Sequence, residues 1–114
     1  MTGAVDWSVL RDLTEQMGDE DIAAMVLDAY RGEIPGRRAA LESALTSTPE
    51  ELRDAVHALK ASSLTVGALR LGELCRQSEA LVVSGDLEAA RDYGSQALAE
   101  LDLVSADLEA GPPA

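Results

Sequence analysis

The chain has 114 residues, which is enough for one domain with a modest core. Apolar residues make up 46% of it, aromatic residues only 3%, and Phe is absent, a composition that favours packed helices over β-sheets. A formal net charge of −12 argues against binding to nucleic acid or to anionic membranes, because both would repel such a surface.

The N-terminal sequence and the cysteine count predict a cytoplasmic location. The N-terminal stretch "MTGAVDWSVLRDLTEQ" has neither the basic start nor the apolar run of a signal peptide, and no segment is apolar for long enough to span a bilayer. Cys75 is the one cysteine, so no internal disulfide can form, which suits a reducing compartment. We therefore expect a soluble cytoplasmic protein.

The first two predicted helices are separated by Gly18. Asp6 can cap a short helix that ends at this glycine, and the next helix begins with the acidic run "DED" at residues 19–21. Pro35 lies within "GEIPG" in the second pattern, where it removes one backbone donor. We predict one long helix kinked at Pro35, with two separate helices as the alternative. The apolar residues expected to face the core are Trp7, Leu10, Leu13 and Met17, then Ile22, Met25, Val26, Ala29, Ile34, Leu41, Ala44 and Leu45.

Three further helices follow at short intervals. "TPEE" is a strong start signal, with Thr48 as the cap, Pro49 in the first turn and Glu51 closing a capping box; this helix should run to about Val66, where Gly67 can end it. The next pattern ends at "SG", and a final helix begins after the cap at residue 86. Their apolar and small inward positions are Leu71, Leu74, Cys75, Ser78, Leu81 and Val82, then Leu87, Ala90, Gly94, Ala97, Leu101, Val104 and Leu108.

These patterns predict an all-α fold. Four long amphipathic helices joined by short turns should form an antiparallel up-down four-helix bundle, with the short N-terminal helix covering one end. We expect residues 1–110 to form this single domain and residues 111–114 to be a disordered tail.

The heptapeptide "HALKASS" at residues 57–63 contains the only histidine and the only lysine of the chain. At about 100° per residue, one side of its helix is apolar or small and should face the core. The opposite side carries His57 and Lys60 one turn apart, together with Arg53, Ala61 and Leu64. The expected core positions are Leu52, Ala55, Val56, Leu59, Ser62, Ser63 and Val66, with the two serine hydroxyls bonded to carbonyls one turn earlier.

Simpler interpretations exist for each of these residues. A lone surface histidine is often incidental, Lys60 can be merely solubilising, and Arg53 can pair with Glu50 or Asp54 for little energy. One His and one Cys on different helices do not make a metal site. No nucleophile elbow or phosphate-binding loop is present, so neither Ser-His-Asp catalysis nor ATP binding is supported.

The stretch "HALKASSLTVGALRLGELCRQSE" closely resembles the signature of histidine-containing phosphotransfer (HPt) domains. Upstream, "YRGEIPGRRAALESAL" is similar to the family's Pro-containing helix, so the resemblance covers roughly residues 20 to 85. One departure is Ala61, where the family usually has Gly. The positions that match in order and spacing are His57, Leu59, Lys60, Ser62, Ser63, Gly67, Ala68, Leu71, Leu74, Cys75 and Glu79.

The resemblance implies a phosphocarrier rather than an enzyme. His57 would accept a phosphoryl group from an aspartate of a response-regulator receiver domain and pass it to another, Lys60 would stabilise the phosphate, and Arg53 would support it. Ala61, Leu64 and Thr65 would contact the receiver. The chain would bind no cofactor or metal, since Mg²⁺ would belong to the receiver. The expected partners are receiver domains and a hybrid sensor histidine kinase, and we expect a monomer.

Two alternatives remain at this point. A pseudo-HPt adaptor would fold in the same way and bind a kinase or receiver without carrying phosphate, although intact His57 and Lys60 weigh against it. A dimeric histidine-kinase core would need an ATP-binding domain, and an acidic residue usually follows its acceptor histidine, where this chain has Ala58.

Overall fold

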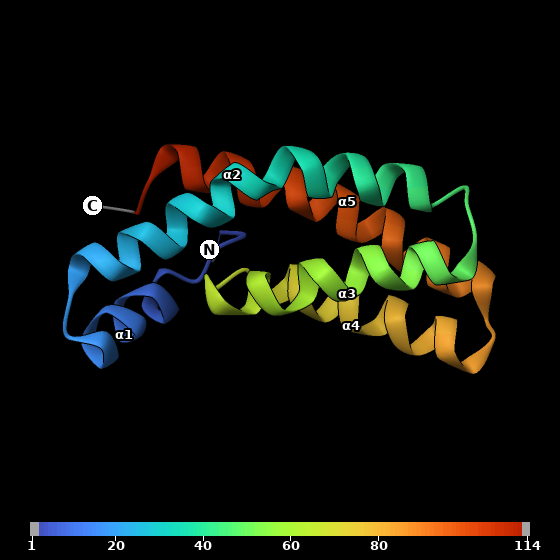
Figure 1. Ribbon diagram of the computed structural model, residues 1–114, viewed down its shortest axis with the longest axis horizontal. Coiled ribbons are helices and arrows are strands. Elements are labelled where there is room, and N and C mark those ends of the chain that lie inside the picture. The colour runs from blue at the N-terminus through green and yellow to red at the C-terminus, as the bar shows by residue number, and fades with distance from the viewer. Residues whose placement is uncertain (1–2, 113–114) are drawn as a thin grey trace.

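Five helices and no strand make up the computed structural model, which describes residues 3–112 (Figure 1). The all-helical prediction is confirmed, and the predicted boundaries agree with those observed. The helices are α1 (Trp7–Met17), α2 (Glu20–Ala44), α3 (Pro49–Thr65), α4 (Leu69–Ser84) and α5 (Leu87–Ala110). Of the predicted tail, residues 113–114 lie outside the described part, as do residues 1–2 at the other terminus.

Most helices begin where a side chain caps the backbone. Asp6, Asp19 and Asp86 each accept a hydrogen bond from a backbone N–H of the first turn, and the Thr48 hydroxyl accepts one from Glu51. The capping box at α3 is only half formed. The Glu51 carboxylate accepts a hydrogen bond from the Ser47 hydroxyl instead of reaching the backbone of the cap.

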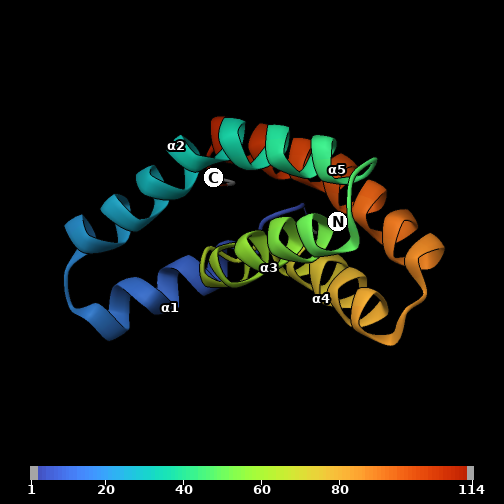
Figure 2. The ribbon, with the colours of Figure 1, turned by 45° about the vertical axis from the view of Figure 1, so that its right-hand side comes forward.

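Helix α2 runs without interruption through Pro35, so the prediction of one long helix is confirmed and the two-helix alternative is wrong. Figure 2 shows that α2 changes direction along its length, as expected where a proline removes one hydrogen bond of the helix. The side chain of Pro35 faces solvent.

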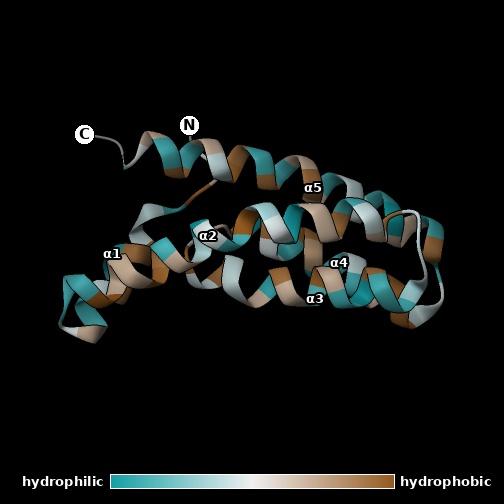
Figure 3. Ribbon diagram, turned by 45° about the horizontal axis from the view of Figure 1, so that its top comes forward, coloured by the Kyte–Doolittle hydropathy of each residue, from teal (hydrophilic) through white to brown (hydrophobic). Residues whose placement is uncertain are grey.

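The long helices pack in a ring in which α2 contacts α3 and α5, and α4 contacts the same two helices. Helix α1 packs on the first half of α2 at one end, while the α2–α3 and α4–α5 turns lie together at the other end (Figure 1). Hydrophobic residues recur among hydrophilic ones along each helix (Figure 3), and the buried ones form its inward face. Fully buried leucines from four helices form the centre of the core: Leu41, Leu52, Leu59, Leu71, Leu101 and Leu108.

The predicted inward face of the first half of α2 is correct at Val26, which packs against the core, and wrong at Ile22, Met25 and Ala29. Ile22 and Met25 are exposed, whereas Ala23 and Tyr30, two turns apart, are buried. Helix α2 is rotated about its axis so that Tyr30 faces inward. Its large ring packs in the core, and its hydroxyl lies 3.0 Å from the Ser63 hydroxyl on α3. Among the described residues, no helix is long and apolar enough to cross a membrane.

The same contact corrects the prediction for Ser63. Ser62 does bond to the backbone one turn earlier, at the Leu59 carbonyl, but the fully buried Ser63 hydroxyl pairs with Tyr30 instead. Burial raises the pKa of the Tyr30 phenol, so this group stays protonated at neutral pH. The pair therefore links α2 to the helix that carries His57.

We predict that Tyr30→Phe lowers the free energy of unfolding by about 1–2 kcal/mol, because it leaves the buried Ser63 hydroxyl without its partner. Adding Ser63→Ala should recover most of this loss, since both polar groups are then gone. The matched control is Tyr93→Phe, which removes a hydroxyl from a half-buried tyrosine that has no hydrogen-bond partner within residues 3–112. Urea denaturation measures all four proteins. Equal losses in the two Tyr→Phe variants would contradict the assignment.

Candidate functional site: a histidine, a glutamate and a lysine between α3 and α4

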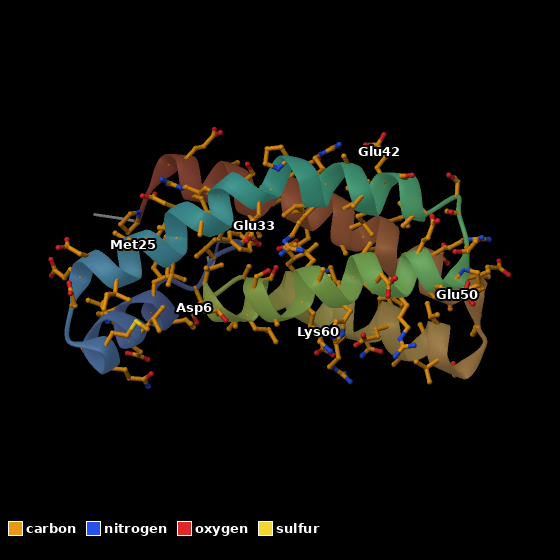
Figure 4. All side chains as sticks on the ribbon, viewed as in Figure 1. Asp6, Met25, Glu33, Glu42, Glu50 and Lys60 are labelled. Carbon is orange, nitrogen blue, oxygen red and sulfur yellow. The ribbon has the colours of Figure 1, made fainter. Side chains whose placement is uncertain are left out.

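The predicted outer side of α3 does face away from the core. The His57 side chain is 66% exposed, although Val56 and Leu59 on either side of it in the sequence are buried. Arg53, Ala61 and Leu64 are exposed on the same helix, while Lys60 is half-buried, and Figure 4 shows Lys60 on the side of α3 that is turned away from α2. The histidine is therefore open to a partner molecule.

A carboxylate from the neighbouring helix joins the two residues. Glu79 of α4 lies 2.6 Å from His57 through Oε2 and Nδ1, and its other oxygen, Oε1, accepts a hydrogen bond of 2.7 Å from Lys60 Nζ. The Glu79 side chain is only 17% exposed. One half-buried carboxylate thus fixes the positions of an imidazole and an ammonium group.

The electrostatics of this cluster determine which ring nitrogen is free. The hydrogen bond from Lys60 and, to a smaller extent, the one from His57 hold the pKa of Glu79 below its usual range, against burial, which raises it. Glu79 is therefore ionised at neutral pH and can only accept hydrogen bonds. Nδ1 of the neutral imidazole must then be the donor, which leaves a lone pair on Nε2.

Lys60 has a contact that the sequence did not predict. The expectation that it shares a side of α3 with His57 is correct, but its ammonium group is paired with Glu79 rather than free in solvent. Because this ion pair is partly withdrawn from water, it is less screened by salt than a surface pair. Lys60 thus keeps Glu79 in the orientation that His57 requires.

The remaining predicted residues surround the histidine on α3. Arg53 is exposed one turn before it and makes no ion pair with any residue of the 3–112 range, so the alternative in which it pairs with Glu50 or Asp54 is not formed. Leu64 is 42% exposed two turns after the histidine. Thr65 is exposed, and its hydroxyl donates to the Ala61 carbonyl at 3.0 Å.

Cys75 lies behind the site, in the core. Its side chain is fully buried, and burial raises the pKa of the thiol to about 12, so it is an unreactive packing residue. Within the part of the chain that the structure describes, no group of three or more His, Cys, Asp or Glu side chains is arranged to hold a metal ion.

The chain also matches a known family. The family model of the Hpt domain matches residues 25–110. The chain belongs to the Hpt family. The Hpt chain is also similar to the crystal structure of histidine-containing phosphotransfer protein B (HptB) from Pseudomonas aeruginosa PAO1, with a TM-score of 0.78 and 28% sequence identity over 93% of this chain and 91% of that one. No curated protein matches the sequence significantly.

Family membership gives the Hpt chain a role in histidine phosphotransfer within two-component signalling, in which Hpt domains carry phosphoryl groups and interact with receiver domains and kinases. The matched region contains all of α3, α4 and α5, and hence the cluster of His57, Lys60 and Glu79. Sequence reasoning included Glu79 in the family motif but gave it no role. Its spacing along the chain could have suggested one, since α3 and α4 are joined by a short turn and must lie side by side.

We predict that Glu79→Ala changes the tautomer of His57. In the wild type the neutral ring should be protonated at Nδ1, and without the carboxylate it should shift toward protonation at Nε2, the form favoured by free imidazole side chains. Nitrogen-15 NMR of the single histidine distinguishes the two forms. Glu73→Ala is the control, because it removes a carboxylate from the same helix that pairs with Arg76 and not with His57. An unchanged tautomer in Glu79→Ala would contradict this assignment.

Proposed function

We propose that the chain is a phosphocarrier in which Nε2 of His57 accepts a phosphoryl group from a receiver aspartate and passes it to another. The observation that carries the proposal is an imidazole that is 66% exposed and whose Nδ1 is held by Glu79, which leaves Nε2 without a partner on Glu79. In this proposal α2 to α5 act as an antiparallel up-down bundle with α1 covering one end, an arrangement that the packing pairs support.

The transfer step balances in atoms and charge, and it requires no proton to move. The Nε2 lone pair forms the N–P bond while the P–O bond of the aspartyl phosphate breaks, and the aspartate leaves as a carboxylate. The imidazole ring becomes positively charged because Nδ1 keeps its proton. Oε2 of Glu79 lies 2.6 Å from Nδ1, which carries that proton, so its negative charge stabilises the ring as the bond forms.

Lys60 has two functions in this proposal. In the free protein it neutralises Glu79, and in the phosphorylated protein it offsets the roughly two negative charges of the new phosphoryl group. Arg53, one turn before the histidine, supports the second function because it is exposed and unpaired within residues 3–112. The receiver would supply Mg²⁺ and the acidic pocket, so the chain itself needs neither a metal nor a cofactor.

Docking would use the apolar and small residues beside the histidine. Ala61, Leu64 and Thr65 lie on the exposed side of α3, within about 12 Å of His57 along the helix axis. A typical protein interface of about 800 Å² per partner corresponds to a disc of roughly 16 Å radius, so a receiver centred on the imidazole would cover them. A hybrid sensor kinase would be met at the same surface through its own receiver domain.

Incubation with a receiver domain carrying radioactive aspartyl phosphate tests the proposal. Wild-type protein should acquire label that is lost in acid and stable in base, as expected of phosphohistidine, and His57→Gln should acquire none. Label on His57→Gln would mean that the acceptor is another residue. A wild-type protein that binds phosphorylated receivers but never becomes labelled would favour the adaptor alternative.

Lys60→Ala should slow transfer to His57 by about tenfold to a hundredfold, as expected from losing a hydrogen bond to a charged group, and the labelled protein should lose phosphate sooner. Stopped-time labelling measures the rate, and decay of the purified labelled protein measures the lifetime. The control is Arg76→Ala, which removes one positive charge from α4 where the arginine pairs with Glu73. Equal rates and lifetimes in wild type and Lys60→Ala would refute the role of the lysine.

A further inference from the structure

Gly72 occupies an unusual position in α4. It is buried within the helix, where alanine would be more favourable because glycine loses more backbone freedom on folding. Its backbone does not require glycine, since only Gly18, Gly67, Gly85 and Gly111 have a positive φ among the described residues. Its lack of a side chain must therefore be explained by its neighbours.

The neighbour is Leu64 of α3, the exposed leucine beside the phosphotransfer site. A Cβ atom placed on Gly72 would lie 2.4 Å from Leu64 Cδ2 and 2.6 Å from Cγ, much closer than real atoms approach. The three heavy atoms nearest to that position all belong to the Leu64 side chain and none to a backbone. The leucine thus lies over Gly72, in a notch on α4 that exists because residue 72 is a glycine.

Other glycines show that this is not general helix packing. At Gly67 a Cβ would meet the backbone oxygen of Asp6 at 2.3 Å, so that glycine allows two chain segments to approach each other. At Gly94 it would meet Leu45 and Leu52, which belong to the core or pack against it. Gly72 differs because the side chain that it accommodates is 42% exposed and could swing outward into solvent.

We propose that Gly72 is a specificity-determining residue for receiver docking. Because it has no side chain, Leu64 can pack against α4, and this sets how far the apolar surface beside His57 projects into solvent. This inference rests on the proposed function. Leu64 is two helical turns from the histidine, about 10 Å along the axis, and lies inside the area that a receiver would cover. A receiver whose surface fits Leu64 when it is packed against α4 would reach Nε2 of His57. A receiver that needs Leu64 to project outward would not.

The variant Gly72→Ala tests the inference, since its methyl group must displace Leu64. With isolated receiver domains charged with aspartyl phosphate as probes, KM for the best donor should rise about three- to tenfold, the range expected from forcing one side chain off its preferred position, while kcat changes little. The order of preference among the receivers should also change. The matched control is Gly36→Ala, the same substitution in α2, where a Cβ would have no atom within 4 Å.

A double-mutant cycle identifies Leu64 as the cause. In a Leu64→Ala background the shorter side chain no longer reaches residue 72, so Gly72→Ala should have no further effect on KM. Carbon-13 NMR of the Leu64 methyl groups should show a changed side-chain conformation in Gly72→Ala and none in Gly36→Ala. An unchanged KM for every receiver, or the same KM change in the Leu64→Ala background, would overturn the inference.

Labelling with phosphoramidate, a small phosphodonor that needs no docking surface, separates the remaining outcomes. If Gly72→Ala slows this reaction as much as it slows transfer from receivers, the substitution damages the His57 site itself and the inference is wrong. If the wild type takes no label from phosphoramidate or from any receiver, the proposed function fails, whatever Gly72 does.

Discussion

The site depends on one shared carboxylate. Glu79 binds the imidazole of His57 with one oxygen and the ammonium of Lys60 with the other, and both contacts are short. Removing either Lys60 or Glu79 would disturb the cluster. Without Lys60, a half-buried negative charge would lie beside the histidine without compensation, and without Glu79, nothing would fix the ring tautomer. The free lone pair on Nε2 of His57 therefore depends on the Lys60–Glu79 ion pair, which contacts the opposite ring nitrogen.

This arrangement requires α3 and α4 to pack in one register. A shift of α4 by a single residue would turn Glu79 by about 100° around its helix axis and break both contacts. The register is fixed from inside the protein, where Leu59, Leu71 and Cys75 are fully buried and leave no space for sliding. The core thus holds the geometry of a surface site, although none of its side chains takes part in the chemistry.

The negative net charge of the chain gives a reason for the positive side chains close to His57. A chain with a net charge of −12 would gain about two more negative charges on phosphorylation, which the overall field opposes. Lys60 next to His57, with Arg53 one turn away, would compensate this charge locally if His57 carries the phosphoryl group as proposed.

The sequence by itself determined the number of helices, their limits and the outward direction of His57, because caps, glycines and apolar spacing are local signals read along one helix. It also contained the family motif, including Glu79. Only the tertiary structure decided what that glutamate does, that Tyr30 rather than Met25 faces the core, and that Leu64 lies over Gly72. Each of these depends on the rotation and register of one helix against another. Contacts between residues far apart in the chain set those two quantities, and no periodicity within a single helix records them.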